Sequence, residues 1–289
     1  MKAFLKFLSL LWVMLLLSCG PILVAPPEAP PEAVAETVKE YAGVYPGQTV
    51  WQGRVTMLKD VLIPAGAHLI IRPGTEITVF PAEGTKIDPE YLSSLTELLV
   101  RGQLTIEGTE AAPVRFVIAA DKSNTETVAD ETADDIVWAG ITLDRSAKSR
   151  IQFAHIERAD VAILCIASSA LIQGNRITDS RYAIIAQQQS RPKILDNHIS
   201  GGEGGIYCWR GSMPYLKGNR LMGLDEEAIY ADATSRPWLD HNYVSGNAIG
   251  VALYADDLPY DLIEVIDNQE NLRRLGDQGQ TVSQSGGQP

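Results

Sequence analysis

The sequence predicts an all-β protein built as a stacked β-solenoid with about 22 residues in each coil. Asparagine recurs with steps of 22, 22 and 23 residues at Asn175, Asn197, Asn219 and Asn242. Two apolar series run in step with it: Ile141, Ile163, Ile184, Ile206, Ile229 and Ile249, and Ile151, Ile172, Ile194, Leu216 and Leu239. Such a repeat marks an architecture in which one unit cannot bury its apolar face alone, so that stacked units form one continuous core.

Alternation gives the direction of each side chain, because neighbouring residues of a strand point to opposite faces. If Ile206 points inward, so does Cys208, whereas Tyr207 and Trp209 point outward. The equivalent inward pairs are Ile141 with Leu143, Ile163 with Cys165, Ile184 with Ala186, Ile229 with Ala231 and Ile249 with Val251. Cys165 and Cys208 then lie two coils apart, at roughly 9–10 Å, beyond the reach of a disulfide. Both are expected to be buried thiols.

Two polar columns mark the turns between strands. The asparagine column falls at a turn, where asparagine tolerates the left-handed conformation and can stack its amide on the next coil. At another turn a serine column precedes a proline column: Ser168, Ser190, Ser212 and Ser235, with Pro192, Pro214 and Pro237. These columns are typical of structural ladders and indicate no catalytic role.

The N-terminus indicates export. Residues 1–18 are interpreted as a signal peptide, because a positively charged start precedes an apolar run, Phe7 to Leu17, that is too short to span a bilayer. The segment Leu16-Leu17-Ser18-Cys19-Gly20 resembles the lipobox of bacterial lipoproteins. The resemblance implies acylation of Cys19 and, because Gly20 follows it, sorting to the outer membrane, facing the periplasm or the surface. The alternative is an ordinary signal peptide with an incidental cysteine.

The rest of the chain divides into a tether, a body, a cap and a tail. Residues 19–44 form a proline-rich tether, and a helix expected over Ala33 to Tyr41 would cap the first coil. Residues 45–255 form the solenoid. Residues 256–275 are expected to form a helical C-terminal cap, from the spacing of Leu262, Ile266 and Leu272. The tail 276–289 is rich in Gln, Gly and Ser and is expected to be disordered.

The first half of the body alternates β-rich runs with Pro-Gly corners. Its motifs are Arg72-Pro73-Gly74-Thr75, then Gly108-Thr109, then Pro113-Val114-Arg115-Phe116 and Trp138-Ala139-Gly140-Ile141. In these motifs the chain resembles the bacterial right-handed parallel β-helix repeat proteins, related in fold to pectin lyases, over roughly Val50 to Leu253. The resemblance implies a single-stranded right-handed parallel β-helix. It does not fix an activity, since this fold hosts lyases, hydrolases, epimerases, copper-system accessory proteins and proteins without known catalysis.

One local match favours an enzyme. Trp238-Leu239-Asp240-His241 looks like the tryptophan-isoleucine-aspartate-histidine stretch near the calcium-dependent active site of pectate lyases. The arginine-x-proline-x-x-arginine motif of those enzymes is incomplete here, because Arg191-Pro192 and Arg236-Pro237 lack the second arginine. A hydrolase needs two converging carboxylates, and neither Asp134-Asp135 nor Asp256-Asp257 has a partner in a neighbouring coil. We therefore name no catalytic residue, and a polysaccharide lyase or glycoside hydrolase stays as the alternative.

Metals and nucleic acids are not expected ligands. His155 and His198 share a column with Arg176 and Arg220, so a cation separates the two imidazoles, and this spacing predicts no metal site, no copper ligand set and no cofactor. The net charge of −12, from 36 acidic and 24 basic residues, argues against binding to nucleic acid. The acidic stretch 121–135 interrupts the repeat, either as a solvated insertion or as a lid or cation site.

Two outward surfaces are candidate binding sites. His155, Arg176, His198 and Arg220 form a stripe about 4.8 Å from rung to rung, suited to an acidic polysaccharide. The alternative is that its arginines pair with nearby turn carboxylates.

The second surface is aromatic and consists of Tyr207, Trp209 and Tyr230, while Tyr215 and Trp238 form a separate outward pair. The alternative is that a loop or the C-terminal segment covers it. The leading hypothesis is a non-catalytic envelope lipoprotein that binds a glycan or an envelope protein through these lateral faces, with Arg176 and Arg220 favouring acidic ligands.

Overall fold

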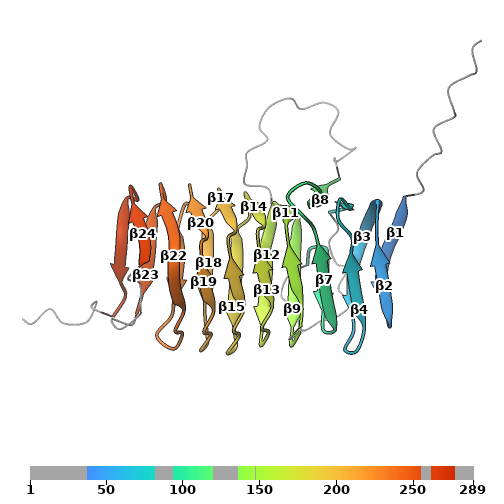
Figure 1. Ribbon diagram of the computed structural model, residues 1–289, viewed down its shortest axis with the longest axis horizontal. Coiled ribbons are helices and arrows are strands. Elements are labelled where there is room, and N and C mark those ends of the chain that lie inside the picture. The colour runs from blue at the N-terminus through green and yellow to red at the C-terminus, as the bar shows by residue number, and fades with distance from the viewer. Residues whose placement is uncertain (1–37, 82–93, 120–135, 147, 255–261, 277–289) are drawn as a thin grey trace, which may run out of the picture. The chain divides into compact units, whose positions relative to one another are not determined.

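The computed structural model describes residues 38–81, 94–119, 136–146, 148–254 and 262–276, all within the compact unit Thr37–Pro289. These residues form 25 strands, paired in parallel, in a β-solenoid of about nine turns. Figure 1 shows the strands side by side along the body, from β1 to β24. The predicted all-β solenoid is confirmed. Within the described ranges, no helix is long and apolar enough to cross a membrane.

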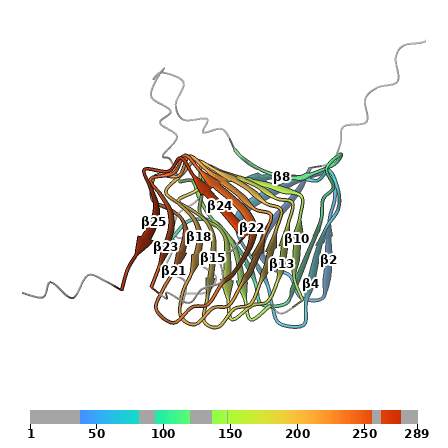
Figure 2. The same cartoon turned by 60° about the vertical axis from the view of Figure 1, so that its left-hand side comes forward.

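Each coil contributes strands to three faces, which Figure 2 shows nearly end-on. Face A contains β6 (Glu97–Val100), β9 (Trp138–Asp144), β12 (Ala159–Ile166), β15 (Tyr182–Gln187), β18 (Gly204–Cys208), β21 (Glu227–Ala231), β23 (Ile249–Leu253) and β25 (Glu270–Arg274). Face B contains β5 (Glu76–Val79), β8 (Val114–Ile118), β11 (Ala154–Glu157), β14 (Arg176–Thr178), β17 (His198–Ser200), β20 (Arg220–Met222) and β24 (Leu262–Ile266). Face C contains β2 (Gln48–Trp51), β4 (His68–Ile71), β7 (Gln103–Glu107), β10 (Arg150–Gln152), β13 (Leu171–Gln173), β16 (Lys193–Leu195) and β19 (Tyr215–Lys217). The longer strands β1 (Lys39–Val44) and β3 (Arg54–Ile63) turn from face B to face A, and β22 (Trp238–Ser245) turns from face C to face B.

The predicted apolar columns are in register, with one shift. Ile141, Ile163, Ile184, Ile206 and Ile229 pair from strand to strand. The column then continues to Val251, whereas Ile249 pairs with Glu227. The predicted column was therefore wrong by two residues in this last coil. The coil keeps a step of 22 residues, from Ile229 to Val251, whereas the prediction took Ile249, the first residue of β23, as the next member. The second series, from Ile151 to Leu239, is confirmed throughout.

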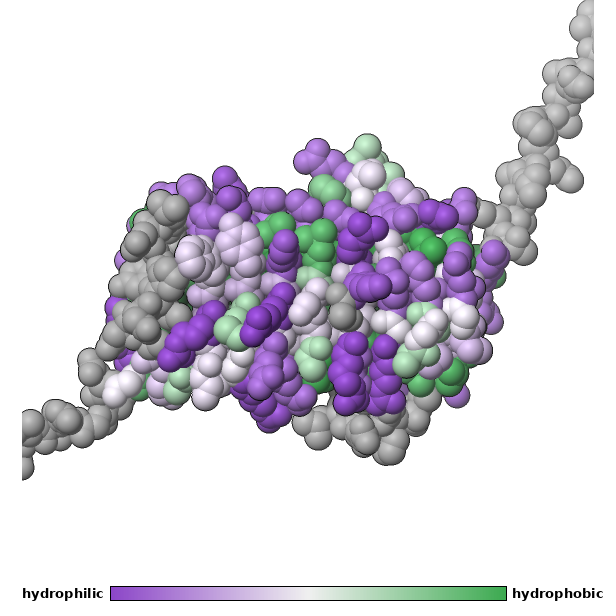
Figure 3. Space-filling model, turned by 60° about the horizontal axis from the view of Figure 1, so that its bottom comes forward, coloured by the Kyte–Doolittle hydropathy of each residue, from purple (hydrophilic) through white to green (hydrophobic). Residues whose placement is uncertain are grey.

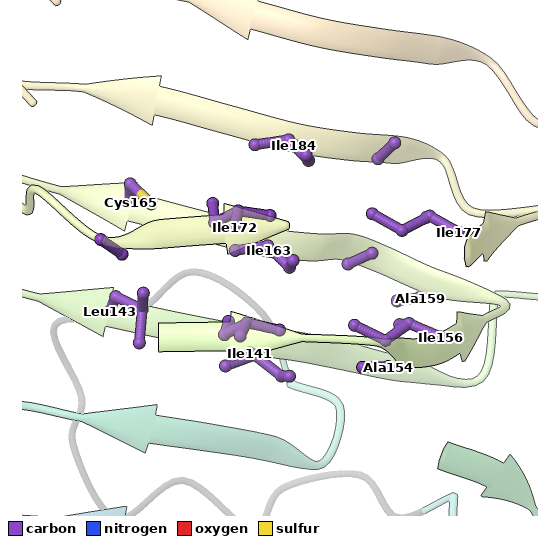
Figure 4. Close-up of a cluster of buried hydrophobic side chains, with 14 of the residues drawn as sticks. Ile141, Leu143, Ala154, Ile156, Ala159, Ile163, Cys165, Ile172, Ile177 and Ile184 are labelled. Atoms are coloured by element: carbon purple, nitrogen blue, oxygen red, sulfur yellow. The ribbon is translucent and has the colours of Figure 1, made fainter. Parts of the chain in front are cut away.

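The core is a stack of such columns. Figure 4 shows Ile141, Ile163 and Ile184 lying one above another inside the coils, with Leu143 and Cys165 beside them. Cys165 and Cys208 are buried free thiols, two strands apart through Ala186. Burial raises the pKa of Cys165 to about 12. The expectation of structural thiols is confirmed for both.

The asparagine column forms a buried amide ladder. The side-chain amide of Asn175 donates to the Oδ1 atom of Asn197 at 2.9 Å, and the same bond links Asn197 to Asn219 and Asn219 to Asn242. The left-handed residue of each turn is the one before the asparagine, for example Gly174. The predicted stacking is therefore confirmed, but the left-handed conformation belongs to the preceding position.

The serine column forms a second ladder. The hydroxyl of Ser190 accepts a hydrogen bond from the backbone N–H of Ser168 at 3.0 Å. In the same way, the hydroxyl of Ser235 accepts a hydrogen bond from the backbone N–H of Ser212 at 3.2 Å. Ser168 in turn accepts from the N–H of Ser146, one coil earlier, at 2.9 Å. These side chains bind main-chain groups at the turns and have the structural role expected for them.

Both predicted helical caps are wrong where the structure describes them. Residues 262–266 and 270–274 form β24 and β25, which pair in parallel with β22 and β23 and so add a further coil. The spacing of their apolar residues fits a helix and fits two short strands equally well. The strands form because the open edges of β22 and β23 offer hydrogen-bonding partners. The turn between them contains Asp267 in a left-handed conformation, with a φ of 55°. At the other end, Lys39–Val44 is a strand, so the solenoid starts before Tyr45.

Several predicted features lie outside the described residues. They are the signal peptide with Cys19, the tether up to residue 37, the acidic stretch 121–135, the aspartate pairs at 134–135 and 256–257, and the tail from 277. On the face drawn in Figure 3, hydrophilic side chains predominate and hydrophobic patches are small and separated.

Candidate functional site

Face B carries a line of basic side chains, here called the basic ladder: Arg115, His155, Arg176, His198 and Arg220. They lie in β8, β11, β14, β17 and β20, and each is paired in register with the next. The arginines are exposed and the histidines half-buried, whereas the residues beside them on these strands are buried. The predicted outward stripe is confirmed, with Arg115 as an additional member.

The column does not continue as a basic line at either end. Before Arg115 it holds Glu76 in β5 and, one strand earlier, Arg54 in β3. After Arg220 it holds Tyr243 in β22 and then Glu264 in β24. Both glutamates are exposed. The basic ladder is therefore a bounded line of five residues between two carboxylates.

The three arginines of the ladder have no ion-pair partner in the described ranges. Among the described residues, Arg115, Arg176 and Arg220 form no ion pair, although other arginines do, such as Arg72 with Glu107 at 2.6 Å. Arg220 instead lies over the ring of Tyr243, 5.5 Å from its centroid. The pairing of the stripe with turn carboxylates, which the sequence left open, is not seen for these three arginines within the part of the chain that the structure describes.

The histidines of the ladder respond to this positive environment. Burial lowers the pKa of His155, and the charges of Arg115 and Arg176 lower it further. Burial and the charges of Arg176 and Arg220 have the same effect on His198. Because each pKa lies below the ordinary value of 6.5, both imidazoles are neutral at neutral pH. Each histidine therefore offers one hydrogen-bond donor and one acceptor between two charged arginines.

Face A carries an aromatic cluster, here the rings of Tyr182, Tyr207, Trp209 and Tyr230. Tyr207 and Tyr230 are stacked with centroids 5.1 Å apart, and Tyr182 meets Tyr207 edge-on at 4.8 Å. Trp209 packs edge-on against Tyr207 at 5.5 Å. The Tyr207 hydroxyl donates to Glu227 at 2.7 Å, and burial, with this bond, raises the pKa of Tyr207.

The cluster is packed into the sheet rather than standing free of it. Tyr207 is only 4% exposed. A Cβ atom at Gly204 would lie 2.4 Å from the Tyr207 ring and 2.7 Å from the Tyr182 ring, so only glycine leaves room for them. Tyr207 therefore has a packing role, whereas Tyr182, Trp209 and Tyr230 are half-buried and reach the surface.

The structure separates the predicted site residues into three groups. Tyr207, Trp209 and Tyr230 lie together on face A, Arg176 and Arg220 lie on face B, and Trp238 begins β22 on face C. The aromatic and basic residues therefore do not form one surface, because a corner of the coil lies between β14 and β15 and another between β17 and β18.

Asp240 on face C is engaged by three neighbours. It accepts from the hydroxyl of Tyr215 at 2.6 Å, pairs with the Lys217 ammonium at 3.0 Å and contacts the His241 ring. The bond from Tyr215, with those from His241 and Lys217, holds the pKa of Asp240 well below its usual range. A general base needs a pKa near the working pH, so Asp240 is not suited to act as one.

The described residues contain no group of three or more His, Cys, Asp or Glu side chains that could hold a metal ion. Arg176 separates His155 from His198 in the column. The thiols of Cys165 and Cys208 are buried in the core, where burial raises both pKa values. Soft metals require thiolate, thioether or imidazole ligands that converge, and this part of the chain does not bring them together.

Arg115 was missed by sequence reasoning. It lies 40 positions before His155 rather than one coil length, because the acidic stretch 121–135 interrupts the count. A signal for it does exist: Val114 and Phe116 are inward residues of one strand, so the residue between them must point outward.

Comparison with known proteins gives one family. No curated protein matches the chain, and no solved structure does. The family model described as "Periplasmic copper-binding protein (NosD)" matches residues 92–269, more than half of the 289 residues, and it covers most of the described coils. The chain, a parallel β-solenoid, belongs to the NosD family of periplasmic proteins.

Proposed function

We propose that this protein is a non-catalytic binding scaffold of the cell envelope, anchored by a lipid on Cys19 to the outer membrane, which holds an acidic glycan on the basic ladder. The observation that carries the proposal is the alignment of Arg115, Arg176 and Arg220 on one face without any ion pair among the described residues. An uncompensated positive line is unusual on a chain with a net charge of −12, and it supplies the attraction that the protein as a whole does not have.

The chemistry of the ladder suits a carboxylated or sulfated sugar chain. Guanidinium groups donate paired hydrogen bonds to planar carboxylates. A single exposed ion pair contributes only about 0.2–1 kcal/mol, so one arginine gives negligible affinity. A ligand that engages all three at once gains from every contact after the first, because the later contacts are intramolecular.

The family description suggests copper as a second ligand. The described residues offer no convergent set of soft ligands, so we assign no copper-dependent step to this part of the chain. The family membership supports the periplasmic compartment, and the proposal rests on face B for the ligand. Cleavage of the glycan is not proposed, because the one lyase-like carboxylate, Asp240, is held by Tyr215, Lys217 and His241.

The test compares two triple variants with the same change in net charge. The ladder variant is Arg115→Ser, Arg176→Ser, Arg220→Ser. The control variant is Arg150→Ser, Arg191→Ser, Arg210→Ser, which removes three exposed arginines from other positions. Binding of the detergent-purified full chain to polygalacturonate and alginate is measured at several salt concentrations.

We expect the ladder variant to lose binding and to reduce the slope of log Kd against log salt by about 2, the value for three charges on a single-stranded polyanion. The control variant should bind like the wild type. Equal binding by both variants would show that net charge, and not the ladder, controls affinity. New chain ends appearing in the polymer during incubation would contradict the non-catalytic part of the proposal.

A further inference from the structure

We infer that the basic ladder takes up an extended, linear polyanion that lies along the axis of the solenoid, and that it engages a segment of fixed length between Arg115 and Arg220. The inference rests on the proposed function and adds the shape of the ligand, its charge spacing and the length that is bound. It is carried by the register of face B and by the residues at the two ends of the ladder.

The direction of the ligand follows from the stacking of the strands. Residues paired in register in neighbouring parallel strands lie about 4.8 Å apart, perpendicular to the strands. The column from Arg115 to Arg220 includes four such steps, so it spans about 19 Å along the axis. The first and last guanidinium groups cannot converge on one compact anion. A ligand that engages all three arginines has to be extended in the same direction.

The alternation of arginine and histidine sets the charge spacing. Arg115, Arg176 and Arg220 are separated by one histidine each, which places the permanent charges about 9–10 Å apart. The neutral imidazoles of His155 and His198 lie between them and can hydrogen-bond hydroxyl groups. A chain of alternating anionic and uncharged sugars has this pattern. A chain with an anionic group at every rung would leave two of its charges opposite neutral side chains.

The ends of the ladder set the length. Glu76 stands one step before Arg115, and Glu264 stands two steps after Arg220, beyond Tyr243. Both carboxylates are exposed, so an anionic group placed beside either one is repelled. Tyr243 also contacts the Arg220 guanidinium by a cation–π interaction, which holds the last charge of the ladder in place. A polyanion that extends past the ladder meets Glu76 before Arg54 at one end, and Tyr243 and then Glu264 at the other, so the next positions of this column add no attraction.

The experiment measures affinity against ligand length. Oligogalacturonates from dimers to dodecamers, and a matched series in which acidic and neutral sugars alternate, are titrated against the full chain at constant pH and salt. We expect affinity to rise with length until the oligomer spans the ladder and then to become constant, after correction for the number of equivalent positions on the ligand. The alternating series should bind at least as tightly as the fully acidic one.

Two variants locate the ends of the bound segment. Arg220→Ser should weaken long oligomers roughly fivefold, the effect of losing about 1 kcal/mol, and should move the plateau to shorter oligomers. The double variant Glu76→Gln, Glu264→Gln should move the plateau to longer ones. Its matched control, Glu40→Gln, Glu110→Gln, removes two exposed glutamates from elsewhere and should leave the plateau unchanged.

The possible failures are distinguishable. Dimers that bind as tightly as dodecamers, or an affinity that increases steadily with length, would overturn the inference and leave the proposed function intact. A plateau that moves equally in both double variants would also overturn it, since net charge would then explain the effect. No binding of any oligomer by the wild type would contradict the proposed function itself, and the inference with it.

Discussion

The asparagine ladder provides the sharpest test of how the coils are held together, through the substitution Asn197→Ala. Asn197 is 1% exposed and lies inside the ladder. Its side-chain amide donates to the carbonyl of Ile172 at 3.0 Å and to Oδ1 of Asn219 at 2.9 Å. Its Oδ1 atom accepts from the backbone N–H of Asn175 at 3.0 Å and from that residue's amide at 2.9 Å. One substitution therefore removes four hydrogen bonds.

The cost depends on which partners have another bond. The side-chain amide of Asn175 still donates to Ile151, and Oδ1 of Asn219 still accepts from the backbone N–H of residue 197. The backbone N–H of Asn175 and the carbonyl of Ile172, a residue of β13, each lose a buried partner. Each such loss costs about 1–3 kcal/mol, so we expect the variant to be destabilised by about 2–6 kcal/mol.

Urea unfolding followed by far-UV circular dichroism measures this effect. The control is Arg191→Ser, an exposed substitution in a neighbouring turn that should change the free energy of unfolding by less than about 0.5 kcal/mol. Because a solenoid can lose its coils in steps, the comparison uses the midpoint of the first transition. Equal midpoints for the two variants would refute the reasoning, since the buried amides would then contribute no more than a solvated side chain.

Two further predictions concern the anchor and pH. Cys19→Ala should release the protein from salt-washed membranes, because the proposed attachment is a lipid on this residue; a variant that still sediments with membranes would contradict the anchor. The lowered pKa values of His155 and His198 mean that the unfolded chain binds more protons between those values and 6.5, so stability should fall as pH falls through that window. In the double variant His155→Gln, His198→Gln, the midpoint of urea unfolding should depend less on pH in this window. A plot of midpoint against pH that runs parallel to that of the wild type would contradict the prediction.

The repeat made most of the fold predictable, because each column must satisfy the same packing in every coil. Ile163, Ile184 and Ile206 could be placed inside the solenoid from spacing and alternation alone. Prediction failed where the repeat has no next member to compare with. Ile249 was assigned to the column that continues to Val251, and the last strands were taken for a helix, because at the end of the chain the pairing edge of the previous coil, rather than the local pattern, selects the structure.

The candidate site was less predictable. The sequence repeat shows which residues stack in one column, but it does not show which columns lie on the same face of the solenoid. Trp209 and Arg220 both point outward, but they lie on different sheets. The corner between those sheets is formed by left-handed residues such as Asp179 and Gly201, and the sequence does not show how far such a corner turns the chain. Among the described residues, Arg176 forms no ion pair. This too could not be predicted, because it depends on distances between side chains of different turns, which the spacing of residues in the sequence does not give.

The alternation of residues in the basic ladder also explains how a solenoid can carry such a line. Two full charges one strand apart, at about 4.8 Å, repel by about 0.9 kcal/mol in water, and at twice that distance by about half as much. At about 9–10 Å, physiological salt screens much of the remainder, because the Debye length is about 8 Å. Histidine at every second position keeps Arg115, Arg176 and Arg220 at the longer distance, and burial, together with the arginine charges, lowers the pKa of both imidazoles. Face B thus presents a continuous row of hydrogen-bond donors at a small cost in stability.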